Sequence, residues 1–212
     1  MQNTAEAAHF CGDPGVQYHT TINRWHTCPN SGNINASNPC SEYMFVDNSA
    51  CNLASINLMK FSDERQTFDT KRFQHTVRIL IIAQEILVDS CSYPTYEITE
   101  NSHRFRPLGL GYANLGALIM RLGKPYDSDE GRSFAAAVTA LMTGTAYLTS
   151  AEMSAGKGPF DAYQQNREPM LNVIGMHRDA LEHIQNDADN AAILDEARKI
   201  WGHAFELGQR HG

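Results

Sequence analysis

Apolar positions after Asp69 recur with a period close to 3.6 residues, which predicts a long amphipathic helix. The residues that share this face are Phe73, Val77, Leu80, Ile81, Gln84, Leu87 and Val88. Asp69 or Thr70 stands just before the pattern begins, and both are residue types that cap helix N-termini. We therefore expect a helix that begins near residue 70.

A second long helix is predicted from about residue 127 to about residue 155. Asp127 or Ser128 is a suitable N-cap, and the two acids that follow place negative charge where the helix dipole favours it. The sequence Gly-Lys-Gly-Pro at 156–159 is typical of a helix end. Further helical patterns cover residues 4–9, 167–184 and 191–208.

Residues 12–62 have a different pattern, in which short apolar runs alternate with Gly, Pro, Asn, Ser and Thr. Such a pattern is typical of loops and strands. The later run 106–111 carries two glycines and leads into apolar positions at helical spacing, which predicts a strand, a glycine turn and a helix. The predicted fold class is α/β, with an excess of helix over about 69–212.

Composition excludes several function classes. The 212 residues carry 17 Lys+Arg and 24 Asp+Glu, a formal net charge of -7, so no basic excess is available for duplex nucleic acid. The apolar run 79–83 is far shorter than the roughly 20 residues that a membrane span needs. Because the first residues also lack the charged and apolar regions of a signal peptide, we expect a cytoplasmic protein without a membrane segment.

The candidate chemistry lies around Cys40. Pro39 has a fixed φ and keeps Asn38 out of the α region, so this segment is extended or looped. In an extended chain Asn38, Cys40 and Glu42 share one face. An amide, a thiol and a carboxylate would then lie together, as an orienting group, a reactive sulfur and a general base. The alternative is an ordinary polar loop with a buried cysteine.

The neighbouring carboxylate also limits what the thiol can do. A carboxylate disfavours a nearby thiolate, whereas nucleophilic cysteines prefer a His or Lys neighbour. Hydrogen-atom chemistry of a neutral thiol is compatible with this arrangement. Cys51 follows Cys40 by 11 residues, and a turn at Asp47 and Asn48 would return the chain toward Cys40. The alternative for Cys51 is a small core cysteine.

Several motifs, in this order, resemble the large catalytic subunit of ribonucleotide reductases. They are GDPGVQY at 12–18, NPCSE at 38–42, ACNLAS at 50–55 and RPLGLG at 106–111. Pro39 and the SEY that follows Cys40 are similar to the adenosylcobalamin-dependent form, class II, as are the stretches 126–131 and 166–170. Class I enzymes, which use a separate radical-generating subunit, usually carry Leu in place of this Pro. The resemblance covers essentially the whole chain.

The resemblance implies roles for individual residues. Cys40 matches the cysteine at the tip of the finger loop (residues 34–46), which becomes a thiyl radical and removes the 3′ hydrogen atom of the ribose. Glu42 matches the carboxylate that takes the 3′-OH proton, and Asn38 the amide that binds the substrate hydroxyls. Cys51 matches one thiol of the pair that ends as a redox-active disulfide. Ser37 is a further candidate for substrate contact.

The resemblance also implies a context. The family fold is a ten-stranded α/β barrel, and residues 1–212 would be an internal fragment of this catalytic domain, inactive by itself. The implied activity is that of an adenosylcobalamin-dependent ribonucleoside-diphosphate reductase, which makes deoxyribonucleotides for DNA synthesis. The full protein would be a homo-oligomer that a thioredoxin-type reductant reduces through a C-terminal tail. The alternatives are a class I large subunit and a non-catalytic helical interaction module.

Two other motifs are interpreted as parts of the structure and not as binding sites. The histidines and cysteines near the N-terminus match no familiar zinc spacing, so we expect no metal site there; they are His9, Cys11, His19, His26 and Cys28. Gly109 and Gly111 resemble a shortened dinucleotide fingerprint, but the third glycine is displaced to Gly116. We interpret the two glycines as positions where another backbone comes close.

Overall fold

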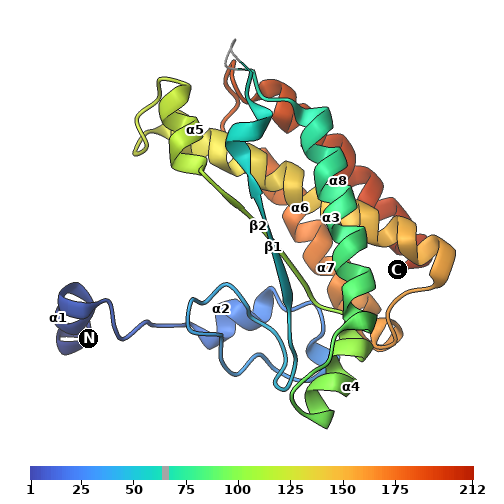
Figure 1. The fold of residues 1–212 in the computed structure, drawn as a ribbon. Helices are drawn as coiled ribbons and strands as arrows, with labels where there is room; N and C mark the ends of the chain where they lie inside the picture. The colour runs from blue at the N-terminus through green and yellow to red at the C-terminus, as the bar shows by residue number, and fades with distance from the viewer. Residues whose placement is uncertain (64–66) are drawn as a thin grey trace.

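The computed structural model describes residues 1–63 and 67–212 and confirms the α/β class with an excess of helix (Figure 1). The α-helices are α1 (Gln2–Cys11), α2 (His19–Arg24), α3 (Thr70–Ser90), α4 (Tyr96–Phe105), α5 (Leu115–Arg121), α6 (Asp129–Lys157), α7 (Tyr163–Ala180) and α8 (Ala191–His211). The strands are β1 (Asn52–Asn57) and β2 (Leu108–Ala113), and short 3-10 helices are η1 (Pro29–Ser31), η2 (Leu58–Phe61) and η3 (Leu181–His183).

The two strands form a parallel pair joined by α3 and α4, which is the βαβ arrangement that parallel pairing requires. The pairing runs from Asn52 opposite Leu108 to Asn57 opposite Ala113. The long helices α3, α6, α7 and α8 lie together on one side of the strands (Figure 1). Ile56 points to this side and joins the core, whereas Leu53 is 67% exposed on the other side. One face of the sheet is therefore packed and the other is open among the described residues.

The predicted helix ends are confirmed where a local cap sets them. The Asp69 carboxylate accepts a hydrogen bond from the Arg72 N–H at 3.0 Å, at the start of α3. Ser128 Oγ accepts one from the Gly131 N–H at 3.0 Å, at the start of α6. α6 ends before Gly158, which has a φ of 88°. These caps satisfy backbone groups that a helix terminus leaves unpaired.

Other boundaries differ from the prediction. Gly109 and Gly111 lie inside β2 and do not form a turn. The chain turns instead at Asn114, whose φ of 66° is a left-handed conformation that Asn tolerates. Residues 12–62 are mostly loop, as expected, but they also contain the short helix α2. α7 begins at Tyr163, before the predicted 167.

The core is built around α6, which packs against α8 and α3. Phe73 of α3, Phe134 of α6 and Trp201 of α8 are among its largest fully buried side chains. Among the described residues, α6 is the helix whose length and composition would allow it to cross a membrane. Half of its apolar window is buried inside the protein, as in the core helix of a globular fold.

Candidate functional site

A turn forms the tip of the finger loop (residues 34–46). Ser37 and Met44 pair as an isolated antiparallel bridge, so the segment between them projects as a closed tip. Within it, the Asn38 carbonyl accepts a hydrogen bond from the Ser41 N–H at 3.0 Å. This bond across four residues is that of a β-turn.

Pro39 and Cys40 occupy the two central positions of this turn. Proline is favoured at the first of them because its fixed φ suits the turn. Ser41 follows with a φ of 64°. Of the two conformations that the sequence allowed for this segment, extended or looped, the structure has the looped one. The shared face of an extended chain therefore does not apply to Asn38, Cys40 and Glu42, because the chain reverses at the turn. The turn leaves the Cys40 thiol exposed at the tip.

Side chains hold the turn in place. Asn38 Oδ1 accepts a hydrogen bond from the Tyr43 N–H at 3.0 Å, which orients the Asn38 amide. Gln17 Nε2 donates to Ser37 Oγ at 2.5 Å and to Ser41 Oγ at 3.3 Å, on either side of the tip. Sequence reasoning missed this role of Gln17. Its only signal was its place in the GDPGVQY motif.

The chain then reverses again, as predicted, and Asn48 has a φ of 53°. The Tyr43 hydroxyl donates to Ser49 Oγ at 2.8 Å, and Ser49 Oγ donates to the Val46 carbonyl at 2.6 Å. Burial raises the pKa of the Tyr43 phenol to about 12, the hydrogen bond with Ser49 opposes this, and the neighbouring Cys51 adds to it. The returning chain thus brings Cys51 beside Tyr43.

Cys51 lies just before β1 and is half-buried. Burial, which is the larger cause, and the negative charge of Glu42 together raise the pKa of its thiol to about 11. The repulsion between carboxylate and thiolate that the sequence indicated for Cys40 thus acts on Cys51. At neutral pH Cys51 is a protonated thiol, which suits hydrogen-atom donation better than nucleophilic attack.

Gly109 makes room for this sulfur. A Cβ atom added to Gly109 would lie 2.8 Å from Cys51 Sγ and still nearer to Leu53 Cδ2, closer than such atoms can approach. It would also lie 3.3 Å from the Asn52 carbonyl, so the expected close approach of another backbone is confirmed at Gly109. A Cβ atom added to Gly111 would meet only Ser55 Oγ, at 3.9 Å, which is an ordinary contact.

A cavity of about 450 Å³ lies beside the finger loop. Its lining includes Glu42 and Tyr43 from the loop and the aromatic side chains Trp25, Phe45, Phe105, Tyr147 and Phe160. Small-molecule sites are commonly clefts of this size that combine aromatic walls with a few polar groups. Glu42 therefore lines this cavity and also acts electrostatically on the thiol of Cys51.

The N-terminal histidines and cysteines do not gather around a metal. In the parts of the chain that the structure describes, no group of three or more His, Cys, Asp or Glu lies close enough to hold an ion. The buried His26 ring contacts the Gly32 carbonyl through Nε2 at 2.9 Å, and its Nδ1 accepts from the Cys28 N–H at 3.4 Å. Burial lowers the pKa of His26 and raises that of the Cys28 thiol. Both residues serve the packing of this loop.

The whole chain, residues 1–212, matches the family described as "Ribonucleotide reductase, barrel domain". It is similar to three proteins named vitamin B12-dependent ribonucleotide reductase. They are from Rhodopirellula baltica (58% identity over 212 residues), Streptomyces coelicolor (50% over 217) and Agrobacterium fabrum (44% over 227). Each match covers 100% of this chain and 20%, 22% and 18% of the respective relative, so the chain spans about a fifth of their length. The chain belongs to the ribonucleotide reductase barrel-domain family.

Proposed function

We propose that the protein that carries this chain reduces ribonucleotides to 2′-deoxyribonucleotides for DNA synthesis, with Cys40 as the radical-bearing thiol. The observation that carries the proposal is the grouping made by the finger loop. The loop exposes Cys40 at its tip and brings the Glu42 carboxylate into electrostatic contact with the thiol of Cys51. An exposed thiol, a carboxylate two positions after it and a protonated second thiol that this carboxylate influences suit an exchange of hydrogen atoms and protons at one sugar.

The proposed reaction begins and ends with a radical on Cys40. The Cys40 thiyl radical takes the hydrogen atom from C3′ of the ribose and becomes a thiol. Glu42 accepts the 3′-OH proton while a thiol of the pair formed by Cys51 and a second cysteine, which we place elsewhere in the protein, protonates the 2′-OH, which leaves as water. The pair then supplies two electrons and its second proton, which place a hydrogen on C2′, and becomes a disulfide, and Glu42 returns its proton to the 3′ oxygen. Cys40 then returns its hydrogen atom to C3′ and becomes a radical again.

Two neighbouring side chains position the substrate in this proposal. The Asn38 amide, oriented by its bond to the Tyr43 N–H, hydrogen-bonds the ribose hydroxyls. Ser37 adds a contact from the base of the tip, where its Oγ also donates to the Asn38 carbonyl at 2.8 Å. The ribonucleotide reaches these groups from the cavity that Glu42 lines.

The names of the relatives lead us to propose adenosylcobalamin, a cobalt cofactor, in preference to a separate radical-generating subunit. The exposure of Cys40 fits this group, because a corrinoid is larger than the neighbouring cavity and must meet the thiol from outside it. When bound, the cofactor supplies the oxidising equivalent that converts the Cys40 thiol into a radical. The chain contributes the turn and the Gln17 contacts that keep the thiol at the tip.

The wider context is also part of the proposal. We place residues 1–212 in a ten-stranded α/β barrel, with the finger loop over about 34–46, the helical part over about 69–212, and the open face of β1 and β2 toward the barrel interior. A relative from Mycobacterium tuberculosis, 34% identical over 163 residues, is named a vitamin B12-dependent ribonucleoside-diphosphate reductase, which favours diphosphate substrates. We further propose a cytoplasmic homo-oligomer that is reduced by a thioredoxin-type protein.

The substitution Cys40→Ser in the full-length protein tests the radical role. We expect deoxyribonucleotide formation to fall by more than about 1,000-fold, because a serine hydroxyl does not form the required radical, while the fold is retained. Cys91→Ser is the matched control, since Cys91 is an exposed cysteine at the end of α3, away from the loop. Turnover of Cys40→Ser at the rate of Cys91→Ser would refute the proposed role.

A further inference from the structure

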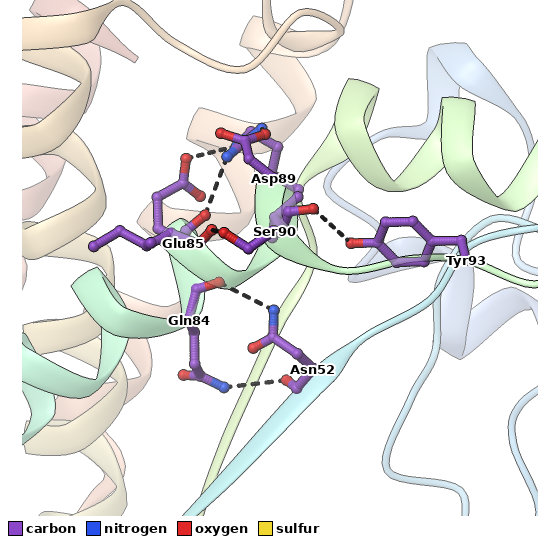
Figure 2. Close-up of polar contacts among 9 residues, drawn as sticks. Asn52, Gln84, Glu85, Asp89, Ser90 and Tyr93 are labelled. Atoms are coloured by element: carbon purple, nitrogen blue, oxygen red, sulfur yellow. Dashed lines mark hydrogen bonds and ion pairs between the residues drawn. The ribbon is translucent and has the colours of Figure 1, made fainter.

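Gln84 is the polar member of an otherwise apolar stripe on α3. The buried residues of this helix are Phe73, Val77, Ile81, Gln84 and Val88. Gln84 is only 3% exposed, and it points toward the strands rather than to solvent (Figure 2). Burial of an amide is unfavourable unless the amide is hydrogen-bonded, so this position requires specific partners.

The partners of Gln84 are backbone groups of both strands. Gln84 Nε2 donates to the Asn52 carbonyl at 3.1 Å and to the Gly109 carbonyl at 2.6 Å. In return, Asn52 Nδ2 donates to the Gln84 backbone carbonyl at 3.1 Å. Figure 2 shows this reciprocal pair between α3 and the start of β1. One side chain therefore holds the beginnings of β1 and β2 to the same turn of α3.

Both carbonyls that Gln84 holds belong to residues that contact the Cys51 sulfur. The Asn52 carbonyl also accepts the Cys51 S–H at 3.5 Å, so the amide of Gln84 and this thiol share one acceptor. Gly109 is the residue whose missing side chain leaves space for Cys51 Sγ. Gln84 therefore holds both the Asn52 carbonyl, which accepts the Cys51 S–H, and Gly109, against which the Cys51 sulfur packs.

Two buried acceptors at this site have no hydrogen-bond partner among the described residues. They are Gln84 Oε1 and Asn52 Oδ1. An unpaired buried carbonyl is destabilising, so stability alone does not explain an amide at this position. Stability at this strand start has another source. Arg106 binds the carboxylate of Glu85, the residue after Gln84 in α3, at 2.6 Å and that of Asp89 at 2.7 Å.

We propose that Gln84 is a positioning residue that sets the place of the Cys51 thiol through the carbonyls of Asn52 and Gly109. The inference deepens the proposed function and rests on it for its meaning, since Cys51 is the thiol that delivers reducing equivalents. Gln84 itself touches neither the substrate nor the cofactor. Its loss lets the sulfur move while the rest of α3 and the strands stay in place.

The first test is Gln84→Met in the full-length protein, which keeps the length of the side chain and removes its donor. We expect the rate of Cys51 alkylation by iodoacetamide to rise relative to that of Cys40 in the same sample, as measured by mass spectrometry. We also expect kcat to fall by about 10- to 100-fold with KM unchanged, because a small displacement of a reacting group costs rate and not binding. Gln74→Met is the control, since the buried Gln74 Nε2 donates no hydrogen bond to any described residue.

The second test approaches the sulfur from the other side and does not depend on the folding of Gln84→Met. Gly109→Ala adds a Cβ atom 2.8 Å from Cys51 Sγ and still nearer to Leu53 Cδ2, the end of a side chain that is 67% exposed and can move aside. Gly111→Ala, two residues along the same strand, has no such contacts. We expect Gly109→Ala to change the ratio of Cys51 to Cys40 alkylation and to lower kcat, and Gly111→Ala to do neither.

The outcomes separate the inference from the proposed function. If Gln84→Met has the Cys51 alkylation rate and kcat of Gln74→Met, the positioning role is refuted. If Gly109→Ala matches Gly111→Ala in both measurements, the packing of the sulfur is refuted as well. The alkylation ratio is measured without turnover, so a wild-type protein that forms no deoxyribonucleotide would contradict the proposed function and leave this test of Gln84 intact.

Discussion

At the scale of single residues, Glu42 acts on a thiol nine positions further along the sequence, that of Cys51. Cys40 is a central residue of the turn at Asn38–Ser41, and Glu42 follows this turn directly. The charge of Glu42 helps to keep Cys51 protonated. Cys40 is thus an exposed thiol and Cys51 a protonated one, and the Glu42 carboxylate is the group that can exchange protons near Cys51.

The effect of Glu42 on Cys51 can be measured directly. Because the negative charge raises the pKa of the thiol, Glu42→Gln lowers it from about 11 toward its ordinary value. Only the thiolate reacts rapidly with iodoacetamide, so the midpoint of Cys51 alkylation moves to lower pH and its rate at pH 9 rises. Asp47→Asn removes another carboxylate of the same segment and is the control. Coincident pH profiles for Glu42→Gln and Asp47→Asn would refute the interaction.

At the scale of secondary structure, the predictions succeeded where neighbours in sequence decide the outcome. The starts of α3 and α6 follow from the caps Asp69 and Ser128. The conformation around Pro39 could not be predicted in this way, because proline suits both an extended segment and a turn. The turn is held by Gln17, whose contact with Ser41 spans 24 positions. Distant contacts of this kind leave no local pattern.

The glycines of β2 show the same limit. A pair of glycines beside a helical pattern is typical of a turn, and only the pairing with β1 shows why Gly109 lies in a strand. Cys51 packs against Gly109, although α3 and α4 separate the two residues along the sequence. The candidate site residues could be selected from the sequence because motifs carry them, whereas the role of Gln84 required the arrangement of both strands.

The contact between α6 and α8 allows a matched test of packing. A Cβ atom added to Gly144 would lie 2.8 Å from Trp201 Nε1, which donates to the Ala140 carbonyl at 2.9 Å. Gly144→Ala therefore overpacks this contact, and we expect a loss of about 1–3 kcal/mol of unfolding free energy. Gly202→Ala, which meets no atom within 4 Å, should instead gain up to about 1 kcal/mol, as alanine favours the helix. Urea denaturation measures both, and a stabilised Gly144→Ala would contradict the packing argument.

At the scale of the whole molecule, the loops that carry the site are attached to the helices through α7. Pro169 lies inside this helix and has no N–H to donate to the Gln165 carbonyl four positions earlier. Asn30 Nδ2 donates to that carbonyl at 2.6 Å instead. The proline thus leaves an acceptor for the N-terminal loops, and α7 continues through Pro169.

Asn166 completes this attachment from one turn of α7. It is fully buried, its Oδ1 accepts from the Asn30 N–H at 3.0 Å, and its Nδ2 donates to Ser31 Oγ at 2.7 Å. The contact with Asn30 joins residues 136 positions apart. Since Ser31 precedes the finger loop by only a few residues, Asn166 helps to set the position of the loop, together with Gln165, which contacts both Asn30 and Ser31.

The dependence predicts a local effect of Asn166→Ala. The substitution leaves the N–H of Asn30 without its acceptor, and we expect a cost of about 1–3 kcal/mol. In the full-length protein, hydrogen exchange measured by mass spectrometry should accelerate over residues 28–34 while α6 and α8 keep their protection, because local opening need not involve the core. Asn172→Ala on the exposed side of α7 is the control. Equal protection of residues 28–34 in the two variants would show that the loop is held by other contacts, and acceleration throughout α6 would show that Asn166 supports the core and not the loop.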